Sequence, residues 1–308
     1  MNDTGSAKGN KSPPYAVEKL RRFRDSVESG ELGECISTGI PALDQFLGGG
    51  LMPYLYVLMA FPGAGKTTLV QQMIDAITQS GRDVISVDLD MSEDLIFAKA
   101  LSRHSYRLYG PRGAVTMQEV MSLAAHPNGT NMLNELCESY AKTAEHLVMV
   151  RREELMGQES LKEIVKSVCK EGKPKPVVCV DFLQCWASMD SEENEKRAVD
   201  KALDAVKELS QSLKIPVVLI SSVNRASYQK KELTLASAKE SGNIEYAADV
   251  VLGMETVEGD VGEGCRKVRI KTFKTRFDDQ KTFELIMNGA YNVFYSAEER
   301  PRSRGRCI

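Results

Sequence analysis

Residues 60–67, AFPGAGKT, combine small residues with a lysine and a threonine in an order suited to binding phosphate. Small residues allow backbone N–H groups to turn inward around phosphate oxygens. Lys66 would reach the β- and γ-phosphates, which also makes it a catalytic candidate, and the Thr67 hydroxyl would be offered to Mg²⁺. The predicted nucleotide-binding residues of this loop are Pro62, Gly63, Ala64, Gly65, Lys66, Thr67 and Thr68.

The surroundings of this loop favour a phosphate site over a chance glycine-rich turn. Residues 55–61, LYVLMAF, predict a buried strand, and a helix is predicted from Lys66 to about Ser80. The helix would direct its positive N-terminal end at the same anion. The pattern departs from the usual P-loop only at Ala60, which replaces the first glycine.

A second acidic position completes the predicted nucleotide site. The apolar run of residues 177–180, VVCV, ends at Asp181. An aspartate at the end of a buried strand could cap a following helix. Downstream of a P-loop, we instead predict that its carboxylate holds Mg²⁺, directly or through water.

Strands that alternate with helices predict an α/β fold with a mainly parallel sheet covered on both faces. Besides residues 55–61, buried strands are predicted near residues 83–90, 176–181 and 217–221, and residues 92–148 are expected to be mostly helical. After Asp249 the pattern changes to short strands separated by turns. We expect these C-terminal strands to be antiparallel additions at the edge of the sheet.

The 308-residue chain has a formal net charge of −3 and is 42% hydrophobic, which is typical of a globular protein. Seven scattered cysteines suit free thiols in a reducing cytoplasm, and the longest apolar runs are too short to cross a membrane. We therefore expect a cytoplasmic protein with no membrane segment. The predicted domains are a disordered tail (1–14), an amphipathic linker helix (15–30), a domain that contains the P-loop (31–296) and a basic tail (297–308).

The segments around the P-loop resemble a known family. Residues 37–44, STGIPALD, followed by LGGGL and the P-loop, resemble the entry to the RecA-type core of DnaB-like replicative helicases and KaiC-like ATPases. The stretches DFLQ (181–184), IPVVLISSVNR (215–225) and ESGNIEYAAD (240–249) resemble DnaB in particular, and DnaB P-loops often begin with alanine. The resemblance covers about residues 36–295, the family's C-terminal ATPase domain.

The resemblance implies roles for four further residues. Asp90 takes the place of a glutamate that polarises the attacking water, and is one methylene shorter. Ser222 takes the place of a glutamine that senses the γ-phosphate, and is too short to make the same contact unaided. Lys274 and Arg276 match a pair that reaches the triphosphate from the adjacent subunit. Without the resemblance, these two cations would be assigned to an ordinary solvated strand edge.

The resemblance also implies a loop that binds single-stranded DNA. The candidate loop spans residues 224–244, and its alternative is a solvated surface loop. A basic loop tracks phosphates with little sequence preference. The predicted DNA-binding residues are Arg225, Lys230, Lys231 and Lys239.

The function implied is an ATP-dependent DNA translocase or helicase of the DnaB type, assembled as a hexameric ring or helical homo-oligomer, with ATP and Mg²⁺ between subunits. Replication or mobile-element proteins are the expected partners. Only about thirty-five residues precede the core, so we expect no separate N-terminal helical domain and no usual primase contact. The helix at 15–30 would pack on its own domain or on a neighbouring subunit. The alternative function, favoured by Asp90 and Ser222, is a loader or regulatory protein that binds ATP with weak or no hydrolysis.

Overall fold

The computed structural model describes residues 15–30, 34–155, 158–188, 195–223, 233–237, 241–277 and 279–298. The chain divides into two units, the first ending at Glu34 and the second beginning at Cys35. The first unit contains helix α1 (Ala16–Glu28), close to the predicted helix. Its apolar side chains are all more than half exposed, namely those of Tyr15, Val17, Leu20, Phe23 and Val27. The apolar stripe of α1 is therefore not covered within its own unit.

The second unit is built on one sheet, to which the described residues contribute nine strands in the order β3-β2-β4-β5-β1-β6-β7-β8-β9. Pairing is parallel from β3 to β6 and antiparallel from β6 to β9. The strands are β1 (Leu55–Ala60), β2 (Val84–Asp88), β3 (Leu147–Val150), β4 (Val177–Asp181), β5 (Val217–Ser222), β6 (Val250–Val257), β7 (Cys265–Thr275), β8 (Thr282–Asn288) and β9 (Val293–Tyr295). The C-terminal ends of β1, β2, β4 and β5 consequently lie side by side along one edge of the sheet, the edge at which these strands end.

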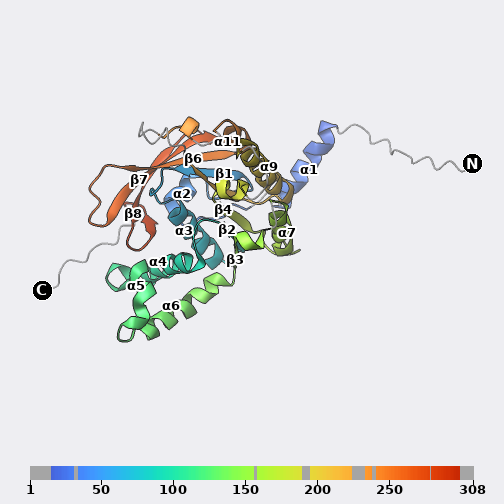
Figure 1. The fold of residues 1–308 in the computed structure, drawn as a ribbon. Coiled ribbons are helices and arrows are strands. Elements are labelled where there is room, and N and C mark those ends of the chain that lie inside the picture. Colours follow the sequence, from blue (N-terminus) through green and yellow to red (C-terminus); the bar gives the residue numbers. More distant parts are fainter. Residues whose placement is uncertain are drawn as a thin grey trace, which may run out of the picture. The chain divides into compact units, whose positions relative to one another are not determined.

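Helices cover both faces of this sheet, as predicted (Figure 1). Alternate side chains of β1 point to opposite faces, so Val57 packs in one core with α9 and Tyr56 in the other with α3. The helices are α2 (Pro41–Phe46), α3 (Lys66–Gln79), α4 (Glu93–Gly113), α5 (Met117–Ser122), α6 (Gly129–Ala144), α7 (Gln158–Val168), α8 (Leu183–Ala187), α9 (Glu195–Leu213) and α11 (Ser241–Ala247), with short 3₁₀ turns at Leu123–Ala125, Arg152–Glu154 and Leu235–Ser237. Burial on both faces explains why the parallel strands are continuously apolar.

Two strands differ from the sequence prediction. β6 is parallel to β1 and antiparallel only to β7, whereas all the strands after Asp249 were expected to be antiparallel. Helix α11 immediately precedes β6 and provides the crossover that a parallel connection requires. β3 was missed altogether. It is a four-residue edge strand directly after the long helical region, too short to give a clear alternation pattern.

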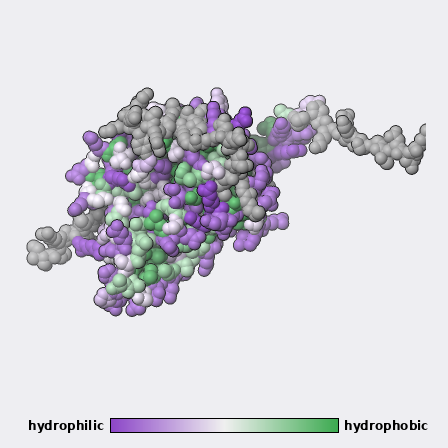
Figure 2. All heavy atoms as spheres, viewed as in Figure 1, coloured by the Kyte–Doolittle hydropathy of each residue, from purple (hydrophilic) through white to green (hydrophobic). Residues whose placement is uncertain are grey.

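Helices α4, α5 and α6 form the helical region expected between β2 and β3, with a small core of their own. Gly110 interrupts α4 with non-helical backbone just before Pro111. Figure 2 shows a face on which hydrophilic residues predominate, with hydrophobic residues among them, some of them in the region where Figure 1 labels α4, α5 and α6. Exposed large apolar residues of this region are Phe97, Leu108 and Met121. Of the helices described, none is both long and apolar enough to cross a membrane.

Candidate nucleotide-binding site

The P-loop joins the end of β1 to the start of α3. Ala60 is fully buried, and Gly65 takes a left-handed conformation with φ of 101° as the residue before the helix. A Cβ added at Gly65 would lie 2.7 Å from the Sδ of Met287, so only glycine fits. The loop borders a cavity of about 540 Å³. The first helical N–H groups of α3 have no partner within the helix and face an anion-binding position.

Lys66 and Thr67 begin helix α3, and both line this cavity. The Nζ of Lys66 donates to the backbone oxygen of Ala60 at 3.0 Å and to that of Phe61 at 3.4 Å. Burial lowers the pKa of Lys66, while the charges of Asp181 and Asp90 act to raise it. The lysine is thus held at the mouth of the loop by carbonyl groups, from which a phosphate oxygen can draw it.

Asp181 ends β4 and faces Thr67 across the loop. The Thr67 hydroxyl donates to Oδ2 of Asp181 at 2.5 Å, which joins two residues 114 positions apart. Burial raises the pKa of Asp181 from 3.8 to about 6, although the Thr67 hydrogen bond acts to lower it. The backbone of Leu89, after β2, donates to the backbone oxygen of Asp181 at 2.9 Å. A hydroxyl and a carboxylate therefore converge where P-loop proteins bind Mg²⁺.

Asp90 and Ser222 line the same cavity, after the end of β2 and at the end of β5. The backbone N–H of Ser222 donates to Oε1 of Gln184 at 3.2 Å, so the side chain of Gln184 helps to place this strand end. Glu93, the next acidic residue, belongs to the first turn of α4, directly after the capping residue Ser92. Asp90 is thus the carboxylate that follows β2 and reaches the cavity.

Lys99 of α4 also lines the cavity and was not identified from the sequence. Burial and the neighbouring charge of Arg103 lower the pKa of Lys99, and Asp181 acts to raise it. In the described part of the chain the only close polar contact of its Nζ is the Sδ of Met91 at 3.4 Å. A half-buried cation without a carboxylate partner suits a site that receives an anion.

The wall opposite the P-loop is formed by the antiparallel strands β7 to β9. It contributes Arg266, Met287, Gly289 and Asn292 to the cavity. Arg266 lies along Met287, with Nη2 3.1 Å from its Sδ. Sequence motifs gave no signal for these residues, because their role depends on folding the C-terminal strands back over the loop.

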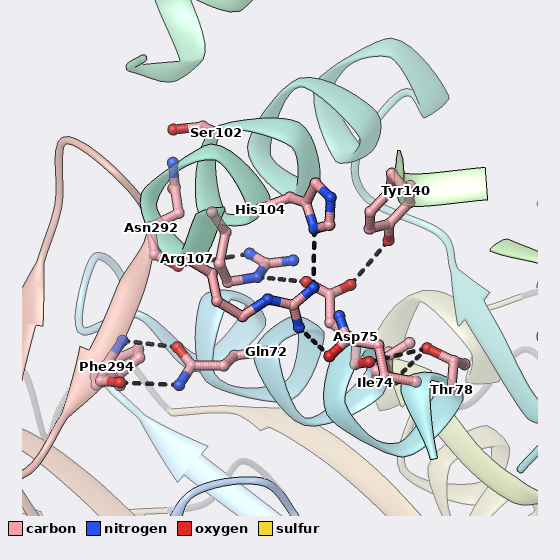
Figure 3. Close-up of polar contacts among 12 residues, drawn as sticks. Gln72, Ile74, Asp75, Thr78, Ser102, His104, Arg107, Tyr140, Asn292 and Phe294 are labelled. Carbon is pink, nitrogen blue, oxygen red and sulfur yellow. Dashed lines mark hydrogen bonds and ion pairs between the residues drawn. The ribbon is translucent and has the colours of Figure 1, made fainter. Parts of the chain in front are cut away.

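A polar network ties this wall to helices α3 and α4 (Figure 3). The amide of Gln72 donates to the backbone oxygen of Phe294 at 2.8 Å and accepts from its N–H at 2.7 Å. Arg103 pairs with Asp75 at 2.6 Å and reaches the backbone oxygen of Asn292 at 3.5 Å. Further members around Asp75 are Tyr140, His104 and Arg107. Asp75, Arg103 and Tyr140 are buried and paired with one another, so these contacts fix the wall on the helix that starts with Lys66.

Lys274 and Arg276 lie at the other edge of the sheet, away from the cavity. Lys274 pairs in register with Val251, near the start of β6. Its Nζ donates to the backbone oxygens of Ala248, at 2.7 Å, and of Glu245. Arg276 forms an ion pair with Asp249, with 3.1 Å between Nε and Oδ1. Lys274 and Arg276 therefore lie close to each other, but neither lies near the P-loop of its own chain.

The predicted DNA-binding residues Arg225, Lys230, Lys231 and Lys239 lie outside the described residues. Their assignment stays a prediction.

The family described as the DnaB-like helicase C terminal domain matches residues 35–296 of this chain. The chain belongs to the DnaB-like helicase family. The resemblance drawn from the sequence motifs is thereby confirmed for the C-terminal domain of the family, the part that carries the P-loop.

Individual relatives place this DnaB-like domain within longer proteins. The replicative DNA helicase DnaB of Helicobacter pylori is 24% identical over 255 residues, covering 77% of this chain and 49% of the relative. The replicative DNA helicase DnaB of Leifsonia xyli is 23% identical over 284 residues, covering 88% and 58%. The chain spans about half the length of the replicative helicases it matches.

Solved structures agree on the fold. One solved ATPase domain superposes with a TM-score of 0.76 at 15% identity, covering 92% of this chain and 99% of that one. A DnaB-like replicative helicase, solved in a study of its interactions with primase, gives a TM-score of 0.73 at 15% identity, covering 92% and 67%. The predicted α/β fold, with a mainly parallel sheet and antiparallel C-terminal strands, is confirmed.

Replacing Asp181 by asparagine is expected to stabilise the nucleotide-free DnaB-like domain above pH 6. Below pH 3.8 this carboxyl is protonated in both the folded and the unfolded chain, and between pH 3.8 and about 6 it ionises only in the unfolded chain. The raised pKa of Asp181 therefore lowers the free energy of unfolding by an amount that grows with pH, up to about 3 kcal/mol. Urea unfolding of both proteins between pH 4.5 and 7.5 measures this cost. The amide oxygen of the variant can still accept from Thr67.

The expected gain of Asp181→Asn in unfolding free energy is largest at pH 7.5 and mostly gone at pH 4.5. A gain that does not change with pH would contradict the raised pKa. The same variant should also lose its response to Mg²⁺ in nucleotide binding, since the amide is a poor ligand for the ion.

Proposed function

We propose that this DnaB-like domain hydrolyses ATP with Mg²⁺ and uses the reaction to move along single-stranded DNA, as a homo-oligomer with ATP bound between subunits. One observation carries the proposal. Lys66, Thr67, Asp181 and Asp90 come from three separate segments and converge on one cavity at the C-terminal edge of the sheet. Ligands of open α/β sheets bind at this edge.

The residues present fit a magnesium–nucleotide. Thr67 and Asp181 would hold Mg²⁺, and they already face each other at 2.5 Å. When bound, the ion would neutralise charge on the phosphates and orient them. The P-loop amides and Lys66 would cradle the phosphates, and the wall that includes Arg266 and Asn292 would border the rest of the nucleotide.

Asp90 is the candidate group for activating the attacking water. It reaches the cavity from the end of β2, next to the strand that carries Asp181. As a carboxylate it would orient the water and accept its proton. Lys99 enters the same cavity from α4 and would stabilise negative charge on the transferred phosphoryl group.

Lys274 and Arg276 can serve only the site of another subunit. Arg276 is bound to Asp249, whose backbone N–H donates to Leu55 at the beginning of β1, whereas the P-loop follows the other end of that strand. Six residues of strand span about 20 Å, more than an arginine side chain can cross. We propose that the two cations reach the triphosphate of a neighbouring copy, which makes hydrolysis depend on assembly.

The exposed apolar stripe of α1 supports the same assembly. Four large apolar side chains on this helix, with Tyr15 directly before it, form a surface of the kind that binds a partner. We propose that α1 packs on an adjacent subunit, and that repeated contacts of this type close into a ring or continue as a helix. The DNA contacts would come from residues 224–244, and replication proteins are the proposed partners.

A second function is favoured by two residues. Asp90 and Ser222 are both shorter than the glutamate and glutamine that the family carries at these positions, and both face the cavity. If neither reaches its partner, the domain would bind ATP and turn it over slowly, acting as a loader or a nucleotide-gated assembly.

Steady-state ATP hydrolysis with and without single-stranded DNA, with the mass of the assembly measured in parallel, separates the two functions. We expect hydrolysis in an oligomer to be stimulated by DNA. Tight ATP binding with negligible turnover in both conditions would instead establish the non-motor function. In that case, Asp90→Glu combined with Ser222→Gln should raise turnover, with each single variant as its control.

A further inference from the structure

The side chain of Arg276 is held in place by a defined set of groups. Its Nε pairs with Oδ1 of Asp249 at 3.1 Å, and its Nη2 donates to the backbone oxygen of Tyr246 at 3.4 Å. Lys274 donates to the carbonyls of Glu245 and Ala248. All of these acceptors belong to the end of α11 or to the two residues after it. The C-terminal carbonyls of a helix attract cations, so the end of α11 is a favourable binding position for the Lys274 and Arg276 side chains.

Asp249 differs from the other acceptors because both its side chain and its backbone are hydrogen-bonded to Leu55. Its Oδ2 accepts from the backbone N–H of Leu55 at 3.0 Å, and its own N–H donates to the Leu55 oxygen at 2.9 Å. Its side chain is only 15% exposed, against 48% for Arg276. Because Asp249 is fixed to Leu55, the first residue of β1, it can hold the Arg276 side chain in a defined position.

The ion pair between Arg276 and Asp249 leaves one nitrogen of the Arg276 guanidinium, Nη1, available for another partner. Asp249 and Tyr246 engage its Nε and Nη2, and no contact of the described residues engages Nη1. A guanidinium held along one edge presents its remaining N–H groups in a fixed direction. Positioning before the reaction lowers the entropy lost in reaching the transition state.

We infer that Asp249 is a positioning residue for Arg276, fixing the arginine to the start of β1 so that it points into the nucleotide site of a neighbouring copy. This inference rests on the proposed role of Arg276 in that site. It assigns the aspartate a part in hydrolysis even though it lies at the edge of the sheet opposite its own P-loop.

The test is a double-mutant cycle of Asp249→Asn and Arg276→Ala in the assembled full chain. The asparagine oxygen can still accept from Leu55, so the fold is retained while the ion pair is lost. Because a displacement of about 1 Å can reduce catalysis 100-fold, we expect Asp249→Asn to lower kcat by about 10- to 100-fold with little change in the KM for ATP. The double variant should be no slower than Arg276→Ala alone. Asp204→Asn, on the exposed face of α9, is the matched control for loss of an aspartate charge.

Each outcome decides between the inference and the function on which it rests. If Arg276→Ala slows hydrolysis but Asp249→Asn does not, or if the two losses multiply, the inference fails and the proposed function stands. If Arg276→Ala leaves kcat unchanged, the proposed function of this arginine fails together with the inference. A fall in melting temperature for Asp249→Asn, without a change in kcat at a temperature where it is folded, would reduce the aspartate to a structural role.

Discussion

Lys66→Ala is expected to abolish ATP hydrolysis, with a loss in kcat of about two to three orders of magnitude, because it removes the cation that faces the phosphates. Lys66 lines the cavity, and its only hydrogen bonds in the described chain are to the carbonyls of Ala60 and Phe61. In the bound state a charged phosphate oxygen would replace these neutral acceptors, and alanine has no group that can donate to it. Steady-state hydrolysis and nucleotide binding, measured on the same preparation, test this expectation.

The fold should not depend on this lysine. Lys66 lines the cavity, from which water can reach the position of its ammonium group, so the melting temperature of Lys66→Ala should stay close to that of the unmodified protein. Lys142→Ala, on the exposed side of α6, controls for loss of a lysine charge. Turnover that survives Lys66→Ala in a protein free of other ATPases would contradict the assignment of the P-loop.

Arg276→Ala is expected to lower kcat by about three to five orders of magnitude, as for other arginines delivered to a phosphoryl group by a neighbour. Binding of ATP should change far less, because the P-loop, Thr67 and Asp181 are untouched. The decisive measurement mixes two inactive proteins, Arg276→Ala and Lys66→Ala, so that they assemble together. A subunit of the first has an intact P-loop, and a subunit of the second has an intact Arg276.

Mixed assemblies should regain hydrolysis, since an intact arginine then faces an intact P-loop across some of the interfaces. The control mixes Arg276→Ala with an assembly that carries both substitutions, where no productive interface can form. Activity in Arg276→Ala alone at the unmodified level, or the absence of recovery in assemblies shown by mass to be mixed, would rule out action in trans.

Local patterns predicted the P-loop and the strands around it well. The buried strand before the loop, the helix from Lys66 and the strand that ends at Asp181 all lie where the alternation of apolar segments indicated. Each depends on interactions between residues close in sequence, such as the helix periodicity and the turn at Gly65. The same reasoning misjudged β6, because whether a strand pairs in parallel is decided by the path of the preceding α11 and not by its own residues.

The wall of the candidate nucleotide site that faces the P-loop could not have been predicted in this way. Gln72 holds Phe294, 222 positions later, and Lys99 enters the cavity from α4, where no motif in the sequence marks it. Such contacts carry no local signature, since any polar residue on an outer helix face is consistent with a solvated surface. Asp249 was likewise noticed only as part of a motif, and its bond to Leu55 spans 194 positions.

The sequence by itself predicted a phosphate-binding site, because a phosphate loop is built from consecutive residues whose backbone must turn inward. It also indicated the family, through short motifs between residues 37 and 249, and the family match to residues 35–296 confirmed it. Only the tertiary structure decided which residues share a site. Folding places Asp90, Asp181 and Lys99 around one cavity and separates Arg276 from it by the length of β1. The physical reason is that a parallel sheet places the C-terminal ends of distant strands at the same edge. The antiparallel strand β7 runs the opposite way, so its C-terminal end, which leads to Arg276, lies at the edge where the parallel strands begin.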